Sequence, residues 1–298
     1  MTAPFRFDIL AAPLFVVLWS TGFIGAKFGL PYIEPVTFLA LRFVFVAAAL
    51  TLWVVLARTA WLTFAQARDA AIIGILLQAV YLGGIYMALD LGVEAGVSAL
   101  IVGLQPVLTA FLARQFLDER LSPVQWAGIA LGVLGVGLVV ARKLELGIGD
   151  WRGVALCLVA LAGISVASIL QKTRAADHPM RTSTLVQFVA ALAVLAPISF
   201  AFETREVTWS GELIFTMAWL VLVMSLGALS LLLFLIRRGA ASNVASLFFL
   251  VPPTTALMAW GVFGEVLGPV EIAGIGLAAS GVLMVNRPAL FSRRLSRG

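Results

Sequence analysis

The sequence predicts an all-α integral membrane protein of ten transmembrane helices, arranged as two inverted five-helix repeats around a central cavity. Three observations support this fold class. Hydrophobic residues make up 62% of the 298-residue chain and charged residues only 12%, against about 25% charged in an ordinary soluble domain. The apolar residues form runs of about 20, the length that crosses a bilayer. The second half of the chain also repeats the first.

The apolar runs define the expected helices in order, and the short polar links between them leave no room for a soluble domain. The first run follows a single basic residue, Arg6, and lacks a small-residue cleavage site, so we expect a retained helix and not a removed signal peptide. The ten predicted spans are residues 9–30, 36–57, 69–90, 94–117, 122–141, 151–172, 180–203, 212–236, 241–264 and 268–287.

The repeat divides the chain into residues 1–147 and 148–298. At an offset of 145 residues, Ser20 and Lys27 recur as Ser165 and Lys172, and Arg42 falls opposite Gln187. At an offset of 146 the matched pairs are Ala99 with Ala245, Leu104 with Leu250, Pro106 with Pro252, Glu119 with Glu265, and Gly135 with Gly281. Five spans per repeat invert the second copy in the membrane, an arrangement that favours alternating access to a central site.

The basic residues predict the orientation. If the N-terminus is cytoplasmic, fourteen Lys and Arg residues fall on that side, and only Arg142, Lys143, Arg152 and Arg205 fall on the other. This bias predicts cytoplasmic termini in a bacterial inner membrane. The net charge of +5 therefore reflects basic links and tails and does not indicate nucleic-acid binding.

Paired prolines interrupt corresponding spans of the two repeats. Pro106 lies near the middle of the fourth span, and Pro252 and Pro253 lie near the middle of the ninth. Proline removes a backbone donor and leaves carbonyl groups free, which membranes tolerate only beside protein or a water-filled cavity. Matched breaks indicate a binding site; a packing kink is the alternative.

Polar and aromatic side chains within the spans are candidates for the cavity, because polar groups at mid-membrane cost free energy unless they face a cavity or a partner. Rings and amides together suit an amino acid with an aromatic side chain. For each ring, an interfacial or lipid-facing position is the alternative. The candidate substrate-binding residues are Trp19, Ser20, Gln78, Tyr81, Ser98, Gln105, Thr109, Ser165, Ser246 and Trp260.

Two charged residues lie inside or at the edge of spans. Lys27 follows the polar cluster of the first span, and Arg42 lies about two turns inside the second. Arg42 either attracts a substrate carboxylate or plays a structural part, pairing with Glu34, Asp90 or Glu94 or reaching outwards to the interface.

At this point the motifs resemble a known family. The segment from Trp19 to Phe43 (WSTGFIGAKFGLPYIEPVTFLALRF) and the spacings Pro106–Glu119 and Pro252–Glu265 resemble the EamA family of the drug/metabolite transporter superfamily. The resemblance covers almost the whole chain and comes nearest to the YddG-type aromatic amino-acid exporters. It implies ten helices, cytoplasmic termini and export of amino acids or other small metabolites.

Other function classes find little support. Ser98 and Ser165 do not complete Gly-x-Ser-x-Gly, His-Glu-x-x-His is absent, and the single cysteine, Cys157, excludes an internal disulfide or a thiolate cluster. We therefore expect no enzyme, cofactor or metal site. No acid lies at mid-span, which favours a facilitator over the alternative, a proton-coupled exporter of other metabolites or drugs. The chain is expected to act as a monomer or homodimer in the lipid bilayer, on a small-molecule substrate.

Overall fold

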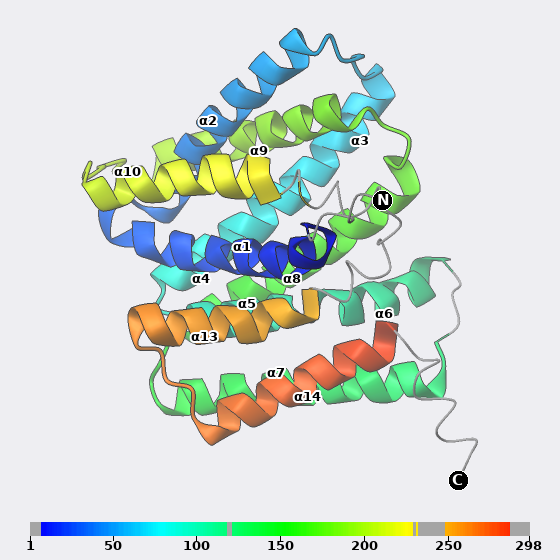
Figure 1. The fold of residues 1–298 in the computed structure, drawn as a ribbon, viewed down its shortest axis with the longest axis vertical. Coiled ribbons are helices and arrows are strands. Elements are labelled where there is room, and N and C mark those ends of the chain that lie inside the picture. The colour runs from blue at the N-terminus through cyan, green and yellow to red at the C-terminus, as the bar shows by residue number, and fades with distance from the viewer. Residues whose placement is uncertain (1–6, 118–120, 229–230, 232–247, 287–298) are drawn as a thin grey trace, which may run out of the picture.

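The protein is a helical bundle (Figure 1). The computed structural model describes residues 7–117, 121–228, 231 and 248–286. Within these ranges the regular elements are all helical. In the described part of the chain, nine helices are long and apolar enough to cross a membrane by length and composition, and the apolar helix Phe248–Phe263 is shorter. The predicted all-α membrane fold of ten helices is confirmed.

The first half of the chain contains one of the two sets of spans. Most spans are single helices, but the third and fourth consist of consecutive segments. The elements are α1 (Phe7–Gly29), η1 (Leu30–Tyr32), α2 (Pro35–Leu56), α3 (Phe64–Gly74), η2 (Ile75–Leu82), α4 (Gly83–Asp90), α5 (Ala95–Val102), α6 (Gln105–Leu117) and α7 (Pro123–Glu145).

The second half follows the same order. Its described elements are α8 (Trp151–Arg174), α9 (Met180–Phe202), α10 (Gly211–Ala218), η3 (Trp219–Ala228), η5 (Phe248–Leu250), α13 (Val251–Phe263) and α14 (Pro269–Asn286).

Local sequence explains where several helices begin. Thr63 and Gln66 form a reciprocal capping box before α3, and Ser122 and Gln125 form another before α7. Each pair satisfies backbone N–H groups that have no partner within the helix. Proline opens α2, α7 and α14, where its missing donor has no cost.

The fourth span is broken where the sequence predicts. Helix α5 ends at Val102, Gly103 and Leu104 form a turn, and α6 begins at Gln105, so that Pro106 lies in its first turn. Pro252 and Pro253 lie in the first turn of α13, after the short 3₁₀ turn η5. Each proline therefore starts a helical segment and does not kink a continuous helix.

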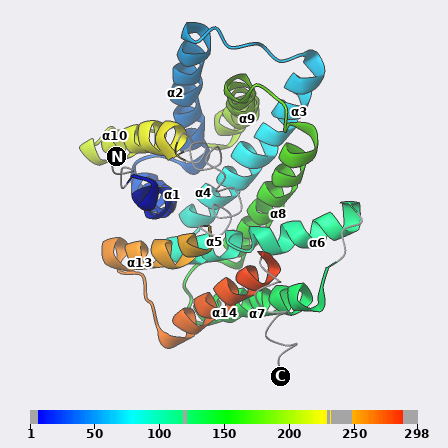
Figure 2. The ribbon, with the colours of Figure 1, turned by 45° about the vertical axis from the view of Figure 1, so that its right-hand side comes forward.

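Helices α7 and α14 pack side by side with their backbones in close approach (Figures 1 and 2). A Cβ atom on Gly135 would lie 2.6 Å from the carbonyl oxygen of Gly274, and one on Gly281 would lie 2.5 Å from that of Gly128. Larger residues cannot occupy these positions without moving a backbone. The glycines of these two helices therefore serve packing within one chain.

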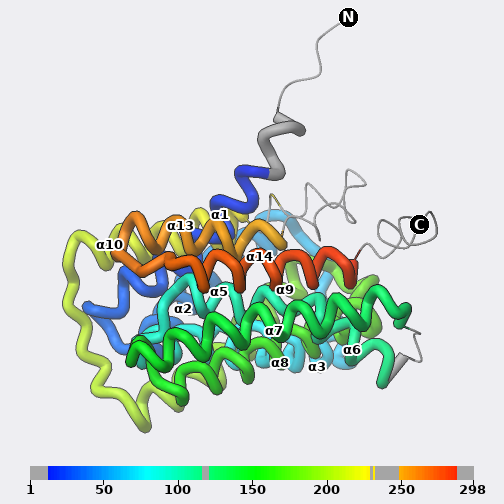
Figure 3. Tube along the Cα trace, turned by 90° about the horizontal axis from the view of Figure 1, so that it is seen from below, coloured from blue at the N-terminus to red at the C-terminus, as the bar shows by residue number. Residues whose placement is uncertain are grey.

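Contacts between helices repeat across the two halves. Helix α1 packs on α13 and on η3, and the corresponding α8 packs on α6 and on η2. Likewise α9 packs on η2, and α2 packs on η3. Among the described residues, α2 also packs on its repeat counterpart α9, and α7 packs on its counterpart α14, the latter pair visible at the near face in Figure 3.

The outer surface of the bundle is apolar. Large hydrophobic side chains are exposed along most of the spans, such as Leu52 and Val55 on α2, Leu134 on α7 and Leu222 on η3. An exposed apolar surface of this extent suits contact with lipid.

Candidate functional site

A cavity of about 230 Å³ lies between the two halves of the chain. Helices α1, α2 and the η2–α4 span line it from the first half, and α8, α9 and η3 line it from the second. The repeat pairs these elements with one another, so equivalent spans of both halves form the walls. Most of its lining is apolar or aromatic, as in small-molecule sites generally. Its lining residues include Trp19, Phe23, Gln78, Tyr81, Ile85, Tyr86, Ile164, Gln187, Phe188 and Met224.

Two wall segments are π-helical and occupy equivalent positions in the repeat. Segment η2 contributes Leu77, Gln78, Tyr81 and Leu82, and segment η3 contributes Met224 and Ser225. π-Helical turns inside α-helices are rare and frequent at functional sites. Their paired occurrence around one cavity marks it as the candidate site.

Arg42 is the one charged side chain among the described lining residues. It is buried on α2 and donates hydrogen bonds to Tyr86 Oη and to Ser225 Oγ, both at 3.0 Å. Its Nε is buried and has no hydrogen-bond partner in the described part of the chain.

The acids that the sequence offers as partners of Arg42 are not in contact with it. Glu94 pairs with Lys143 at 2.8 Å, and Glu34 accepts hydrogen bonds from Thr204 and Arg205. The prediction of an Arg42 ion pair fails because other groups take up these two carboxylates, and Asp90 likewise forms no pair with Arg42.

A smaller cavity adjoins the first and shares Trp19, Phe23, Tyr81 and Ile164 with it. Here the helix breaks of the two halves meet. A Cβ atom on Gly103 would lie 2.7 Å from Pro252 Cγ, and Gln105 and Pro106 line the same space. The Gln105 amide donates to Ser168 Oγ at 2.8 Å, so it bridges the two halves at this point.

Several predicted substrate-binding residues lie elsewhere. Ser20 is fully buried and donates to the carbonyl of Val16, and Ser98 is fully buried against Cys157. The hydroxyl oxygens of Thr109 and Ser165 have no hydrogen-bond partner among the described residues, and neither residue lines a described cavity.

The ring of Trp260 also lies away from the cavity. It is exposed on the outside of α13, where an amphipathic ring suits the lipid interface. Ser246 lies outside the described residues.

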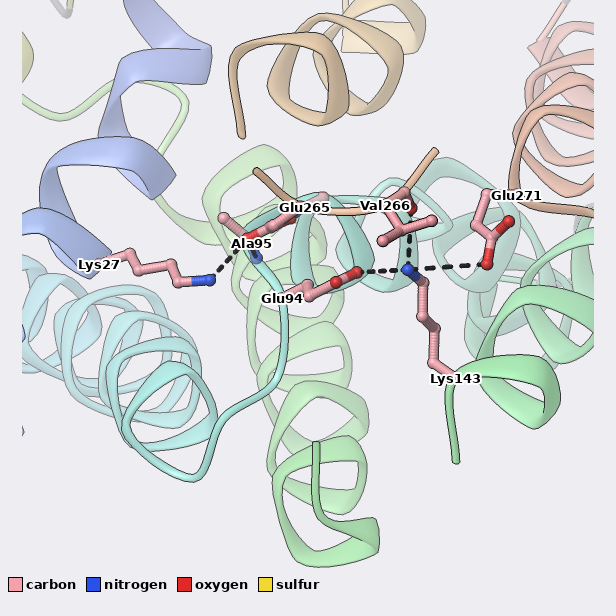
Figure 4. A network of polar contacts seen from close by, with 8 residues as sticks. Lys27, Glu94, Ala95, Lys143, Glu265, Val266 and Glu271 are labelled. Atoms are coloured by element: carbon pink, nitrogen blue, oxygen red, sulfur yellow. Dashed lines mark hydrogen bonds and ion pairs between the residues drawn. The ribbon is translucent and has the colours of Figure 1, made fainter. Parts of the chain in front are cut away.

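Lys27 belongs to a polar network at one end of the bundle (Figure 4). Its Nζ lies 2.8 Å from Glu265 Oε1, and the Glu265 carboxylate also accepts hydrogen bonds from the backbone N–H groups of Ala95 and Gly96. Glu265 therefore joins α1 and the start of α5 to the α13–α14 link, close to the positive end of the α5 dipole.

The same network contains a second, more deeply buried lysine. Lys143 Nζ lies 2.8 Å from Glu94 and 3.6 Å from Glu271, and it donates to the carbonyl of Val266 at 2.9 Å. These contacts tie α7 to the α4–α5 link and to the start of α14. Lys143 is not among the residues predicted for the site, and its place in the last turn of an apolar helix is the signal in the sequence that marks it.

Glu34 and Glu203 form a separate cluster at this end of the bundle. Glu203 accepts hydrogen bonds from the N–H groups of Val36 and Thr37 at the start of α2. Desolvation raises the pKa of the Glu34 carboxyl. Hydrogen bonds from Thr204 and Arg205, together with the positive charge of Arg205, lower it by more, so that the pKa falls below its ordinary value of 4.5. These contacts therefore favour the ionised form of the Glu34 carboxyl.

Comparison with known proteins assigns the chain to a family. The model of the EamA-like transporter family matches it twice, over residues 6–141 and 151–287. The chain belongs to this family. A solved crystal structure aligns with 98% of the chain and 99% of its own length at a TM-score of 0.65 and 20% sequence identity, which shows a common fold.

Relatives of this protein include named transporters. A "Probable amino-acid metabolite efflux pump" of Salmonella typhimurium is 26% identical over 98% of both chains. An "Uncharacterized inner membrane transporter YedA" of Escherichia coli is 22% identical over 91% of this chain and 87% of its own. A "Probable terminal-alkyne amino-acid exporter" of Streptantibioticus cattleyicolor is 28% identical over 69% of this chain and 68% of its own. The family and these relatives support membrane transport of metabolites, and they point to a transporter and not an enzyme.

Proposed function

We propose that this EamA-family protein exports amino acids, aromatic ones in particular, and related small metabolites across the bacterial inner membrane by alternating access. Residues 1–147 and 148–298 act as the two inverted repeats, with both chain termini in the cytoplasm. One chain contains the whole substrate site, which equivalent spans of the two halves enclose, so function requires no second copy.

The observation that carries this proposal is the composition of the central cavity. Trp19, Tyr81 and Phe188 supply aromatic surface, and Gln78 and Gln187 supply amides that can bond a charged or a neutral polar group. A volume of about 230 Å³ exceeds the roughly 150 Å³ of a cavity that takes up benzene. It therefore suits a ring with a short polar extension.

A facilitator is the favoured mechanism. Proton-coupled transporters carry chains of acids or histidines within the membrane, whereas the described lining residues include no Asp, Glu or His. The substrate then moves down its own gradient. A proton-coupled exporter of other metabolites or drugs is the alternative that flux measurements distinguish.

Purified protein in liposomes preloaded with labelled tryptophan, phenylalanine, threonine or a neutral sugar tests the proposal, with and without a pH gradient. We expect saturable efflux of the aromatic amino acids that does not respond to the pH gradient. A response to the gradient would favour proton coupling, and efflux of none of the four compounds would overturn the amino-acid proposal.

Two tryptophans provide a matched pair of variants. Trp19 lines the cavity, whereas Trp260 is exposed on the outside of α13. Trp19→Leu should reduce aromatic efflux roughly two- to tenfold, the effect of losing one aromatic contact, and Trp260→Leu should leave it unchanged. Equal effects of the two substitutions would contradict the placement of the substrate in this cavity.

A further inference from the structure

Arg42 is a permanently charged group in an apolar cavity. The guanidinium of arginine is not deprotonated in proteins, so the side chain cannot relieve its burial by losing its proton. Its exposed fraction is only 6%, and its neighbours in the wall include Phe23, Tyr81 and Ile85. A charge in such a place requires a partner.

The described part of the chain supplies only neutral partners. Tyr86 and Ser225 accept one hydrogen bond each from Arg42, and no carboxylate of the described residues lies within 4.0 Å of it. Residues 229, 230 and 232–247, which lie outside the described part and follow η3 in the sequence, contain no Asp or Glu. Of the five N–H donors of a guanidinium, two are used, and Nε is among those without a partner.

Two lysines show a different arrangement. The ammonium of Lys143, which is buried, and that of Lys27, which is partly exposed, each lie 2.8 Å from a carboxylate. The described part of the chain thus places an acid beside each of these lysines and not beside the arginine that faces the cavity.

From these contacts we propose that Arg42 binds the carboxylate of the transported molecule, and that the cavity selects apolar or aromatic carboxylates. The inference rests on the proposed transport function and narrows its substrate class. A carboxylate matches the forked donor geometry of a guanidinium. The aromatic wall receives the remainder of the molecule.

The same lining predicts indifference to an amino group. The described lining residues offer a positive substituent only neutral acceptors such as Gln78, Gln187 and the tyrosine hydroxyls. The carboxylate therefore determines binding, and an amino acid and its analogue without the amino group bind alike.

Four indole compounds distinguish the contribution of the substrate carboxylate to binding from that of the ammonium group. Tryptophan carries both charges, tryptophanamide lacks the carboxylate, indole-3-propionate lacks the ammonium, and indole-3-propionamide lacks both. Titration calorimetry with the purified full-length protein gives the Kd of each. We expect each carboxylate to bind at least about tenfold more tightly than its amide, as a charge-assisted hydrogen bond predicts, and tryptophan and indole-3-propionate to bind alike.

Variants locate the effect at Arg42. Arg42→Gln should bring each acid and its amide to the same Kd within about twofold, with the amides unchanged. Arg42→Lys, which keeps the charge and loses the fork, should retain part of the preference. Arg152→Gln is the control, because Arg152 is an exposed cation at the start of α8, beside Trp151.

The outcomes are distinguishable. If the wild-type protein binds acids and amides equally, or if Arg42→Gln keeps the preference, the role of Arg42 is overturned while the transport proposal stands. If the wild type binds and transports none of the four compounds, the proposed function fails and this inference with it. The comparison of acids with amides in the wild type shows whether the cavity prefers a carboxylate even if Arg42→Gln does not fold.

Discussion

Two regions of the molecule bury positive charge in opposite ways. At one end of the bundle, Lys143 has two glutamates and a backbone carbonyl around its ammonium group. In the central cavity, Arg42 contacts two neutral hydroxyl groups. The first arrangement is complete within the chain and holds helices together. The second leaves a charge for something outside the chain to neutralise, which is what distinguishes a site from a structural joint.

The largest effect is expected from breaking the complete arrangement. Lys143→Met leaves the buried carboxylates of Glu94 and Glu271 without their cation, and loss of one partner of a buried ion pair costs about 3–5 kcal/mol. Unfolding of the purified protein should show a loss of stability of this size. The neighbouring Arg142→Met is the control, because Arg142 forms only an exposed pair with Glu145, worth about 0–1 kcal/mol. Equal losses of stability in the two variants would contradict a stabilising role of the Lys143 ion pairs.

A smaller loss should follow when the Lys27 pair is broken. Glu265→Gln removes the negative charge but keeps an oxygen that can accept from Ala95 or Gly96. Lys27 is partly exposed, so water can replace part of its interaction. We expect a loss of about 1–3 kcal/mol, the cost of a hydrogen bond to a charged group. Glu145→Gln, at an exposed position, should have no measurable effect.

Removal of the cavity charge should have the smallest effect on folding. In the ligand-free protein, Arg42→Met removes a charge without a carboxylate partner and leaves two neutral hydroxyl groups behind. Stability should change by less than about 1 kcal/mol or increase, since a buried charge without an opposite charge beside it costs folding free energy that its removal recovers. A loss as large as that of Lys143→Met would show that Arg42 has a structural partner and would break the comparison.

The exposed cluster at the end of the bundle should respond to acid. Because the pKa of Glu34 is lowered in the folded protein, its stabilising contribution is fully present above the ordinary value of 4.5 and declines as the pH falls through the lower folded value. The melting temperature of wild type should exceed that of Glu34→Gln near neutral pH, and the two should converge in acid. A difference that persists unchanged in acid would exclude the ionised carboxylate as its cause.

Much of the fold could be predicted from the sequence because it depends on composition and on local signals. Runs of apolar residues define the spans whatever their packing, and Pro106 marks the break between α5 and α6 because proline acts on its own helix. Trp19, Gln78 and Tyr81, proposed as cavity residues, line the cavity in the structure. A polar amide such as that of Gln78 costs free energy in an apolar span unless it faces a cavity or a partner, which limits the positions open to it.

The rest depends on contacts between distant parts of the chain. The outward position of Trp260 and the burial of Ser98 against Cys157 follow from helix rotation, which an apolar sequence does not specify when lipid and protein interior are equally apolar. The pairing of Lys143 with Glu94 requires the approach of two separate links. The π-helical register of η2 and η3 has no local signal in the sequence that we could identify.

The π-helical segment η2 also alters how the faces of its span are aligned. A π turn accommodates one more residue than an α turn, so η2 shifts the following helix α4 by about one residue, or roughly 100° of rotation. Cysteine substitutions along Phe64–Asp90 should therefore show reactive positions whose periodicity changes phase across Ile75–Leu82. The uninterrupted α7 should keep one phase throughout. Cys157, the single native cysteine, is fully buried, so such labelling would start from a protein with almost no reactive background.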